Sequence, residues 1–188
     1  KAAVKRTSIG KLIPQNGPAD RITQRYVPVS IDKQENGTIK VKFPEEISGW
    51  VALKNIVAEE GQKISIKYLS ESPGNGDNIY IAKGSGDESY HARFTWFVFS
   101  EVEISGIDNL SSAQVEAHAV NSDVERSGKF ETSNDLINTI NKIWQRSQLD
   151  NMHGAIASDC PHRERSPYTG DGQVACVTVM HNFSAQTF

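Results

Sequence analysis

Several features that mark other classes of protein are scarce in this sequence. It has two cysteines in 188 residues, Cys160 and Cys176, which are too few for a disulfide framework and do not sit at metal-ligand spacing from other Cys or His residues. No apolar run approaches the roughly 18 residues that a transmembrane helix needs. Lys and Arg form no basic cluster, and the net charge is −3 at pH 7. The sequence therefore predicts no membrane span and no nucleic-acid partner.

The N-terminal residues also lack the apolar stretch of a signal peptide, and the first residue is Lys rather than Met. We therefore expect processed or internal sequence. The hydrophobic share of 37% and the charged share of 23% are ordinary, which indicates a globular protein. A chain of this length suits one ample core, or one small domain together with part of another.

Alternating apolar and polar residues dominate the first two thirds of the chain. Such alternation is typical of strands with one buried face, and turn-forming runs at residues 72–77 and 84–87 separate the segments. We predict strands at residues 38–43, 49–57, 62–69, 78–83, 89–98, 101–105 and 115–120. Short strands at regular spacing predict an antiparallel, jelly-roll-like β-sandwich over residues 1–125.

From about residue 126 the pattern becomes helical. We expect Thr132 or Ser133 to cap a helix that ends near Asn151, with Asp135 in its first turn. A second helix should begin near Gly172. The first helix has one apolar face, which consists of Leu136, Ile137, Ile140, Ile143 and Trp144. Two helices cannot bury such faces alone, so we expect them to pack against further helices of a larger domain.

The segment between the two predicted helices carries the chemistry. Residues 159–171 contain three acids, two arginines, a His and a Tyr, and two prolines stiffen the backbone. Glycoside hydrolysis needs one carboxyl group that stays protonated and others that bind sugar hydroxyls. Neighbouring carboxylates raise each other's pKa and a nearby Arg lowers it, so this cluster suits such a division of roles. On composition alone, a solvated loop with salt bridges remains an equal alternative.

Three segments resemble bacterial α-L-rhamnosidases, glycoside hydrolase family 78. That family has Asp-Cys-Pro, then Glu five residues after the Asp, then Thr-Gly-Asp. Here the matching residues are Asp159-Cys160-Pro161, Glu164 and Thr169-Gly170-Asp171. Residues 47–51 (ISGWV) and 93–96 (RFTW) resemble strands that precede the motif in the family. The resemblance covers roughly residues 40–188.

The resemblance implies an architecture and an activity. Residues 1–125 would form a β-sandwich accessory domain, and residues 126–188 would begin an (α/α)6 catalytic barrel. The family hydrolyses terminal α-L-rhamnose from plant glycosides or polysaccharides with inversion, without a cofactor. Its general base comes from a later barrel helix, so we expect residues 1–188 alone to be inactive and to pack against the rest of the barrel.

The resemblance also assigns roles to individual residues. Glu164 would be the general acid that protonates the glycosidic oxygen. Asp159, Arg163 and Asp171 would bind sugar hydroxyls, and Tyr168 would pack against the apolar face of the sugar. No metal ligand is expected. The sequence departs from the family at Ser166-Pro167, inside the loop itself, and this change leaves the substrate preference open.

Other interpretations of the same residues stay open. The chain could be a non-catalytic carbohydrate-binding or structural β-sandwich module, with Trp50 and Trp96 as a sugar-stacking platform. Alternation along the strands favours a core position for both tryptophans. Asp77, Asp87 and Glu88 could hold calcium, but they lack the spacing of a known loop, so solvated turn acids are the better interpretation. We interpret Cys160 as a small packed residue.

Overall fold

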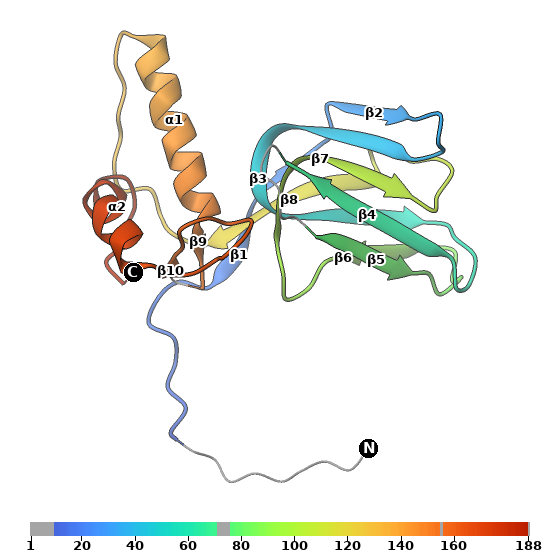
Figure 1. Ribbon diagram of the computed structural model, residues 1–188, viewed down its shortest axis with the longest axis horizontal. Coiled ribbons are helices and arrows are strands. Elements are labelled where there is room, and N and C mark those ends of the chain that lie inside the picture. Colours follow the sequence, from blue (N-terminus) through green and yellow to red (C-terminus); the bar gives the residue numbers. More distant parts are fainter. Residues whose placement is uncertain (1–9, 71–75, 155, 188) are drawn as a thin grey trace.

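One antiparallel sheet makes up most of the molecule. The computed structural model describes residues 10–70, 76–154 and 156–187. Within them, eight strands pair in the order β1-β8-β3-β7-β4-β5, and β2 and β6 also pair with β3. Figure 1 shows that this sheet curls on itself. Its strands are β1 (Asp20–Tyr26), β2 (Ser30–Lys33), β3 (Ile39–Ile56), β4 (Lys63–Leu69), β5 (Asp77–Ile81), β6 (Glu88–His91), β7 (Phe97–Ser105) and β8 (Val115–Ser122).

The helical part lies at one end of the sheet (Figure 1). It consists of α1 (Asp135–Asp150), a ribbon of β9 (Met152–His153) and β10 (Ile156–Ala157), and α2 (Thr169–Asn182). An antiparallel β-rich part followed by helices is the predicted fold class, and it is confirmed. Among the described helices, none has the length and apolar character needed to cross a bilayer.

The long strand β3 allows the sheet to curl. Its first half pairs with β2 and β7, and its second half pairs with β8 and β6. The register with β7 shifts between Lys42 and Ile47, around Pro44, which cannot donate to a ladder. At Gly49 a Cβ atom would lie 1.9 Å from the carbonyl oxygen of His118, so only glycine allows this close approach of β8.

The core lies between the inward faces of these strands. Alternate β3 residues, Ile39, Val41 and Phe43, are almost completely buried. The ring of Phe43 meets that of Phe99 edge to face, with centroids 5.8 Å apart, and Phe99 also contacts Tyr68. The alternation that predicts strands in the sequence is therefore the alternation that fills this core.

Two features of the predicted strands need correction. The sequence gives no prediction for β1 and β2, whose residues are mostly polar and half-exposed. Residues 89–98 do not form one strand, because the chain leaves the sheet between β6 and β7, where Phe94 has a φ of 60°. The predicted turn at residues 72–77 lies mostly outside the described residues.

The cap of α1 is Asn134 rather than Thr132 or Ser133. The Asn134 side-chain oxygen accepts hydrogen bonds from the N–H groups of Leu136 (3.0 Å) and Ile137 (3.3 Å). The Thr132 hydroxyl instead donates to the Asn134 carbonyl oxygen. Thr132, Ser133 and Asn134 each carry a side-chain oxygen that can cap a helix, and the sequence alone does not determine which of them is the cap.

The second helix also begins earlier than predicted. It starts at Thr169 rather than near Gly172, and Tyr168 at its N-cap makes no capping hydrogen bond with its side chain. Glycines at two positions of the first turn weaken the helical signal in the sequence. The consequence is that Asp171 belongs to the first turn of α2, where the helix dipole favours a carboxylate.

Glu88 is not a solvated turn acid. It is buried at the start of β6 and accepts hydrogen bonds from the N–H groups of Lys83 and Ser85 and from the Tyr80 hydroxyl. The bonds from Lys83 and Tyr80 lower the pKa of Glu88 to about 2. Its carboxylate therefore fixes the turn between β5 and β6.

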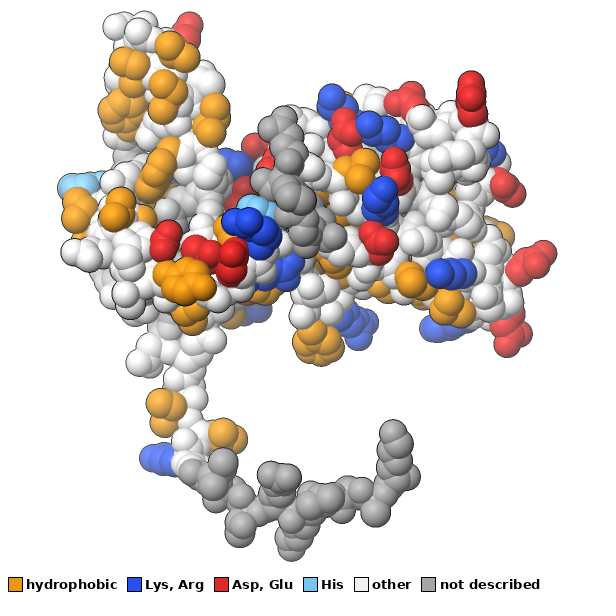
Figure 2. Space-filling view, viewed as in Figure 1, with side chains coloured by type: hydrophobic (Ala, Val, Ile, Leu, Met, Phe, Trp, Pro, Cys, Tyr) orange, Lys and Arg blue, Asp and Glu red, His pale blue; other side chains and the backbone are white. Residues whose placement is uncertain are grey.

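Apolar side chains remain exposed on both helices. Figure 2 shows them gathered along α1. On α2 the hydrophobic residues at 174, 177 and 180 are more than half exposed as well. The exposed apolar residues of α1 are Leu136, Ile137, Ile140 and Ile143. These are the residues for which the sequence predicts packing against further helices.

Phe99→Ala should destabilise the chain strongly. Phe99 is fully buried, and removal of such a ring costs about 3–5 kcal/mol in lost transfer energy and cavity formation. Phe94→Ala is the matched control, because the Phe94 side chain is fully exposed and its removal should change stability by less than about 0.5 kcal/mol. Urea unfolding of the three proteins measures the difference, and equal midpoints for both variants would contradict this core.

Candidate functional site

The acidic loop that the sequence singles out connects β10 to α2. The backbone N–H of Asp159 donates to the carbonyl oxygen of Ser166 (3.1 Å), and the N–H of Ser166 donates to Asp159 Oδ1 (3.0 Å). These two bonds close the loop at its base. Arg165 has a φ of 54°, a backbone conformation that costs a non-glycine residue energy. The loop is therefore a closed turn with stored backbone strain.

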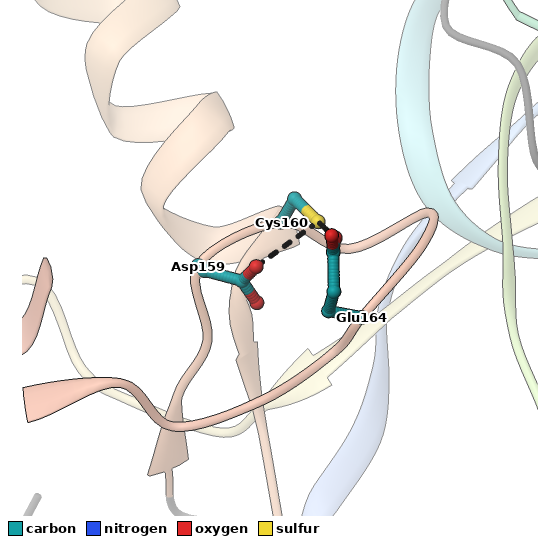
Figure 3. A group of neighbouring side chains, drawn as sticks. All are labelled: Asp159, Cys160 and Glu164. Carbon is teal, nitrogen blue, oxygen red and sulfur yellow. Dashed lines mark hydrogen bonds between the residues drawn. The ribbon is translucent and has the colours of Figure 1, made fainter.

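Two predicted site residues meet around a thiol. Figure 3 shows the side chains of Asp159 and Glu164 on either side of Cys160. The Cys160 thiol donates to Glu164 Oε2 at 3.0 Å, and its sulfur lies 3.4 Å from Asp159 Oδ2. Cys160 is thus more than a small packed residue, because it bridges the two carboxyl groups that the sequence predicts to work together.

The pKa of Glu164 is lowered, whereas the sequence predicts that one carboxyl group of the cluster stays protonated. The hydrogen bond from the Cys160 thiol lowers this pKa, and the positive charge of Arg163 lowers it further. Burial raises the pKa of Asp159, but hydrogen bonds from the N–H groups of Ser166 and Cys160 outweigh that effect and leave the pKa lowered. The described residues therefore favour two ionised carboxylates rather than one protonated acid.

The other three predicted residues lie around this pair. Arg163 Nε is 3.5 Å from Glu164 Oε2, and both side chains are about half exposed. Asp171 and Asp159 line the same groove, between the end of α1 and the start of α2. Tyr168 is half-exposed and lines a neighbouring, mostly apolar groove with Met152. The structure brings Asp159, Arg163 and Glu164 together, places Asp171 in a groove with Asp159, and sets Tyr168 to one side.

Trp96, the residue directly before β7, contacts this loop. The indole Nε1–H of Trp96 donates to the carbonyl oxygen of Pro161 (3.2 Å), and Arg165 Nη2 donates to the carbonyl oxygen of Trp96 (2.9 Å). The Arg165 guanidinium also lies 4.9 Å from the centre of the Trp96 ring. The same ring stacks on His153, with centroids 3.9 Å apart. The sequence does not reveal these contacts, which join residues 65 to 69 positions apart.

Buried polar groups join the end of α1 to the sheet. Asp150 Oδ1 accepts from the backbone N–H of Ser48 on β3 (2.8 Å) and pairs with Arg146 (3.1 Å). The Ser48 hydroxyl lies 2.8 Å from His153 Nε2. Burial raises the pKa of Asp150 to about 6, although Arg146 and Ser48 favour its charged form. Asp20 on β1 accepts from the N–H of Gly154 (2.7 Å) and completes the junction.

The side chains of Asp159, Cys160 and Glu164 also offer atoms of the kind that bind a metal ion. Asp159, Cys160 and Glu164 each offer one ligand atom, and these atoms lie within 4.8 Å of one another. The thiol has one proton, which it donates to Glu164, and exposed acids commonly gather without an ion. These residues support hydrogen bonding to a neutral ligand such as a sugar better than they support a metal centre.

The sequence of this chain is similar to those of known α-L-rhamnosidases. Residues 125–188 match the family described as bacterial alpha-L-rhamnosidase 6 hairpin glycosidase domain. An α-L-rhamnosidase of Formosa agariphila is 32% identical, in a match that covers 96% of this chain and 21% of the relative. The chain therefore spans about a fifth of the length of that relative.

Solved structures agree with this match. The α-L-rhamnosidase from Dictyoglumus thermophilum superimposes with a TM-score of 0.84 at 33% identity, over 93% of this chain and 21% of that one. A Streptomyces avermitilis α-L-rhamnosidase, complexed with L-rhamnose, gives a TM-score of 0.85 at 22% identity, over 94% and 18% of the two chains. The second likeness shows the fold alone, and the first extends to the sequence.

Cys160→Ala should raise the pKa of the Glu164 carboxyl group, because it removes the hydrogen bond that stabilises the carboxylate. Cys160→Ser should restore part of the effect, since a hydroxyl also donates. Cys176→Ala is the control, because that thiol is exposed on α2 and bonds to the carbonyl oxygen of Gln173. Carbon-13 NMR titration of the Glu164 carboxyl measures the shift, and an unchanged pKa in Cys160→Ala would show that the thiol does not act on Glu164.

Proposed function

Because the chain belongs to the bacterial α-L-rhamnosidase family, we propose that it is part of an enzyme that hydrolyses terminal α-L-rhamnosides and that Glu164 is the general acid. Residues 1–125 form the accessory sandwich in this proposal, and residues 126–188 begin the (α/α)6 barrel. The substrate is a rhamnose-containing glycoside or polysaccharide. No cofactor takes part.

The observation that carries the proposal is the placement of Glu164 beside Asp159 on a closed loop. Its carboxyl group is held from one side by the Cys160 thiol, and the side chain remains 45% exposed. A general acid needs both features, because it must be fixed in direction and must still reach the oxygen that it protonates. Asp159 and Asp171 share a groove next to it and can accept hydrogen bonds from sugar hydroxyls.

In the proposed reaction, Glu164 donates its proton to the glycosidic oxygen as the bond between that oxygen and the anomeric carbon breaks. A water molecule attacks the anomeric carbon from the opposite face and gives its proton to a second carboxylate. In inverting glycosidases the two carboxyl groups are about 6.5–9.5 Å apart, which leaves room for the water. We place this base outside residues 1–188.

Glu164 must be protonated before each turnover. The Cys160 thiol and Arg163 lower its pKa, so the acid form needs an opposing effect. A bound sugar removes water from the carboxyl group, and desolvation raises the pKa of an acid. Packing of the remaining barrel over the half-exposed side chain would act in the same direction. We infer that Glu164 becomes a competent acid only in the closed, sugar-filled site.

Glu164→Gln, made in the complete protein that contains this chain, should lower kcat/KM for an α-L-rhamnoside by about 10²–10⁴-fold, because glutamine cannot supply the proton. The matched control is Glu131→Gln, since Glu131 is exposed and pairs only loosely with Lys129. The measurement is hydrolysis of p-nitrophenyl α-L-rhamnoside beside other aryl glycosides. Hydrolysis of a different aryl glycoside, without hydrolysis of the rhamnoside, would mean that the proposed substrate is wrong. No turnover of any of these substrates would favour a non-catalytic sugar-binding module.

The isolated 188-residue chain should show no rhamnoside turnover, because the proposed base lies outside it. The same aryl rhamnoside assay at high protein concentration measures this. The prediction fails if the isolated chain turns over the substrate and loses that activity in Glu164→Gln. Such a result would mean that a carboxylate within residues 1–188 activates the water.

A further inference from the structure

Trp96, directly before β7, makes two hydrogen bonds and a cation–π contact with the acidic loop. We propose that Trp96 is a positioning residue for Glu164, which holds the loop so that the carboxyl group keeps its direction. This inference rests on the proposed function of Glu164 as general acid. Trp96 does not need to touch the substrate, because it acts through its two neighbours in the loop, Pro161 and Arg165.

Trp96 contacts the loop before and after Glu164 in the sequence. Its indole N–H donates to Pro161, three residues before Glu164, and its carbonyl oxygen accepts from Arg165, the residue that follows Glu164. One residue directly before β7 therefore fixes the loop on both sides of the proposed acid. A side chain on a mobile loop would not keep a fixed orientation. Small displacements of catalytic groups lower the reaction rate by large factors.

The Trp96 ring is itself held in place. It stacks on His153 with an interplanar angle of 7°, and the Ser48 hydroxyl lies within hydrogen-bonding distance of that imidazole. His153 is buried at the junction of α1 and the sheet. The position of the ring thus depends on the packing of the sheet against the helical part, and the loop takes its position from the ring.

Backbone strain supports the same inference. Arg165 keeps a φ of 54°, which a non-glycine residue adopts only when its surroundings stabilise it. Its guanidinium is the group that bonds to the Trp96 carbonyl oxygen and covers the Trp96 ring. Loss of these contacts would let the Arg165 backbone relax, and Glu164 is the adjacent residue. Relaxation of the strained Arg165 backbone would therefore change the direction of the Glu164 side chain.

The test uses Trp96→Phe in the complete protein, because phenylalanine keeps an aromatic ring and lacks the indole N–H donor. A misplaced acid harms substrates whose leaving group needs protonation more than substrates whose leaving group does not. We expect Trp96→Phe to lower kcat about tenfold for a methyl α-L-rhamnoside and less than about twofold for a dinitrophenyl α-L-rhamnoside. Arg165→Lys, which keeps the charge and loses the planar stack, should show the same selectivity.

Trp50→Phe is the matched control. The Trp50 indole nitrogen has no hydrogen-bond partner among the described residues, and its ring stacks on His91, away from the loop. This variant should affect both rhamnosides equally. Hydrogen exchange provides a readout that does not need turnover: the amides of Asp159 and Ser166 should exchange about fivefold to tenfold faster in Trp96→Phe and unchanged in Trp50→Phe.

The outcomes separate the inference from the function on which it rests. Wild-type enzyme without rhamnoside turnover would reject the proposed function and, with it, the role of Trp96 in catalysis. An active wild type in which Trp96→Phe slows both rhamnosides equally, or leaves loop exchange unchanged, would overturn the positioning role alone. Selective loss on the methyl rhamnoside together with faster loop exchange would support both.

Discussion

The hydrogen bond from the backbone of Ser48 to the carboxylate of Asp150 ties the helical part of the molecule to the sheet. Asp150 is buried, and a buried carboxylate is costly unless charged or hydrogen-bonded partners compensate. Arg146, four residues earlier on α1, provides one of those partners within the helix, and the Ser48 N–H provides the other only when the end of α1 lies against β3. Asp150 therefore favours this placement of α1 over others, because any other placement would lose the hydrogen bond from Ser48.

From this junction the contacts lead outward to the proposed acid. His153 follows Asp150 by three residues and lies under the Trp96 ring, which in turn holds the loop at Pro161 and Arg165. The Cys160 thiol then fixes the direction of Glu164 within that loop. The β-rich part is thus part of the support of the candidate site.

The sequence predicts some of this and not the rest, for physical reasons. Core strands such as β3 and β4 were predictable, because burial on one face imposes alternation, whereas β1 exposes most of its residues and leaves no such pattern. The grouping of Asp159 and Glu164 followed from their nearness in the chain. The role of Trp96 and the lowered pKa of Glu164 were not predictable, since both depend on contacts that arise only when the chain folds.

A crystal structure of the complete protein with bound L-rhamnose would test the central claim most directly. The account predicts that a Glu164 carboxyl oxygen lies about 2.6–3.2 Å from the oxygen on the anomeric carbon, which is hydrogen-bonding distance for proton transfer. Asp159 and Asp171 should then accept bonds from other hydroxyls of the same sugar. Rhamnose bound elsewhere, or a Glu164 side chain turned away from the anomeric oxygen, would contradict the account.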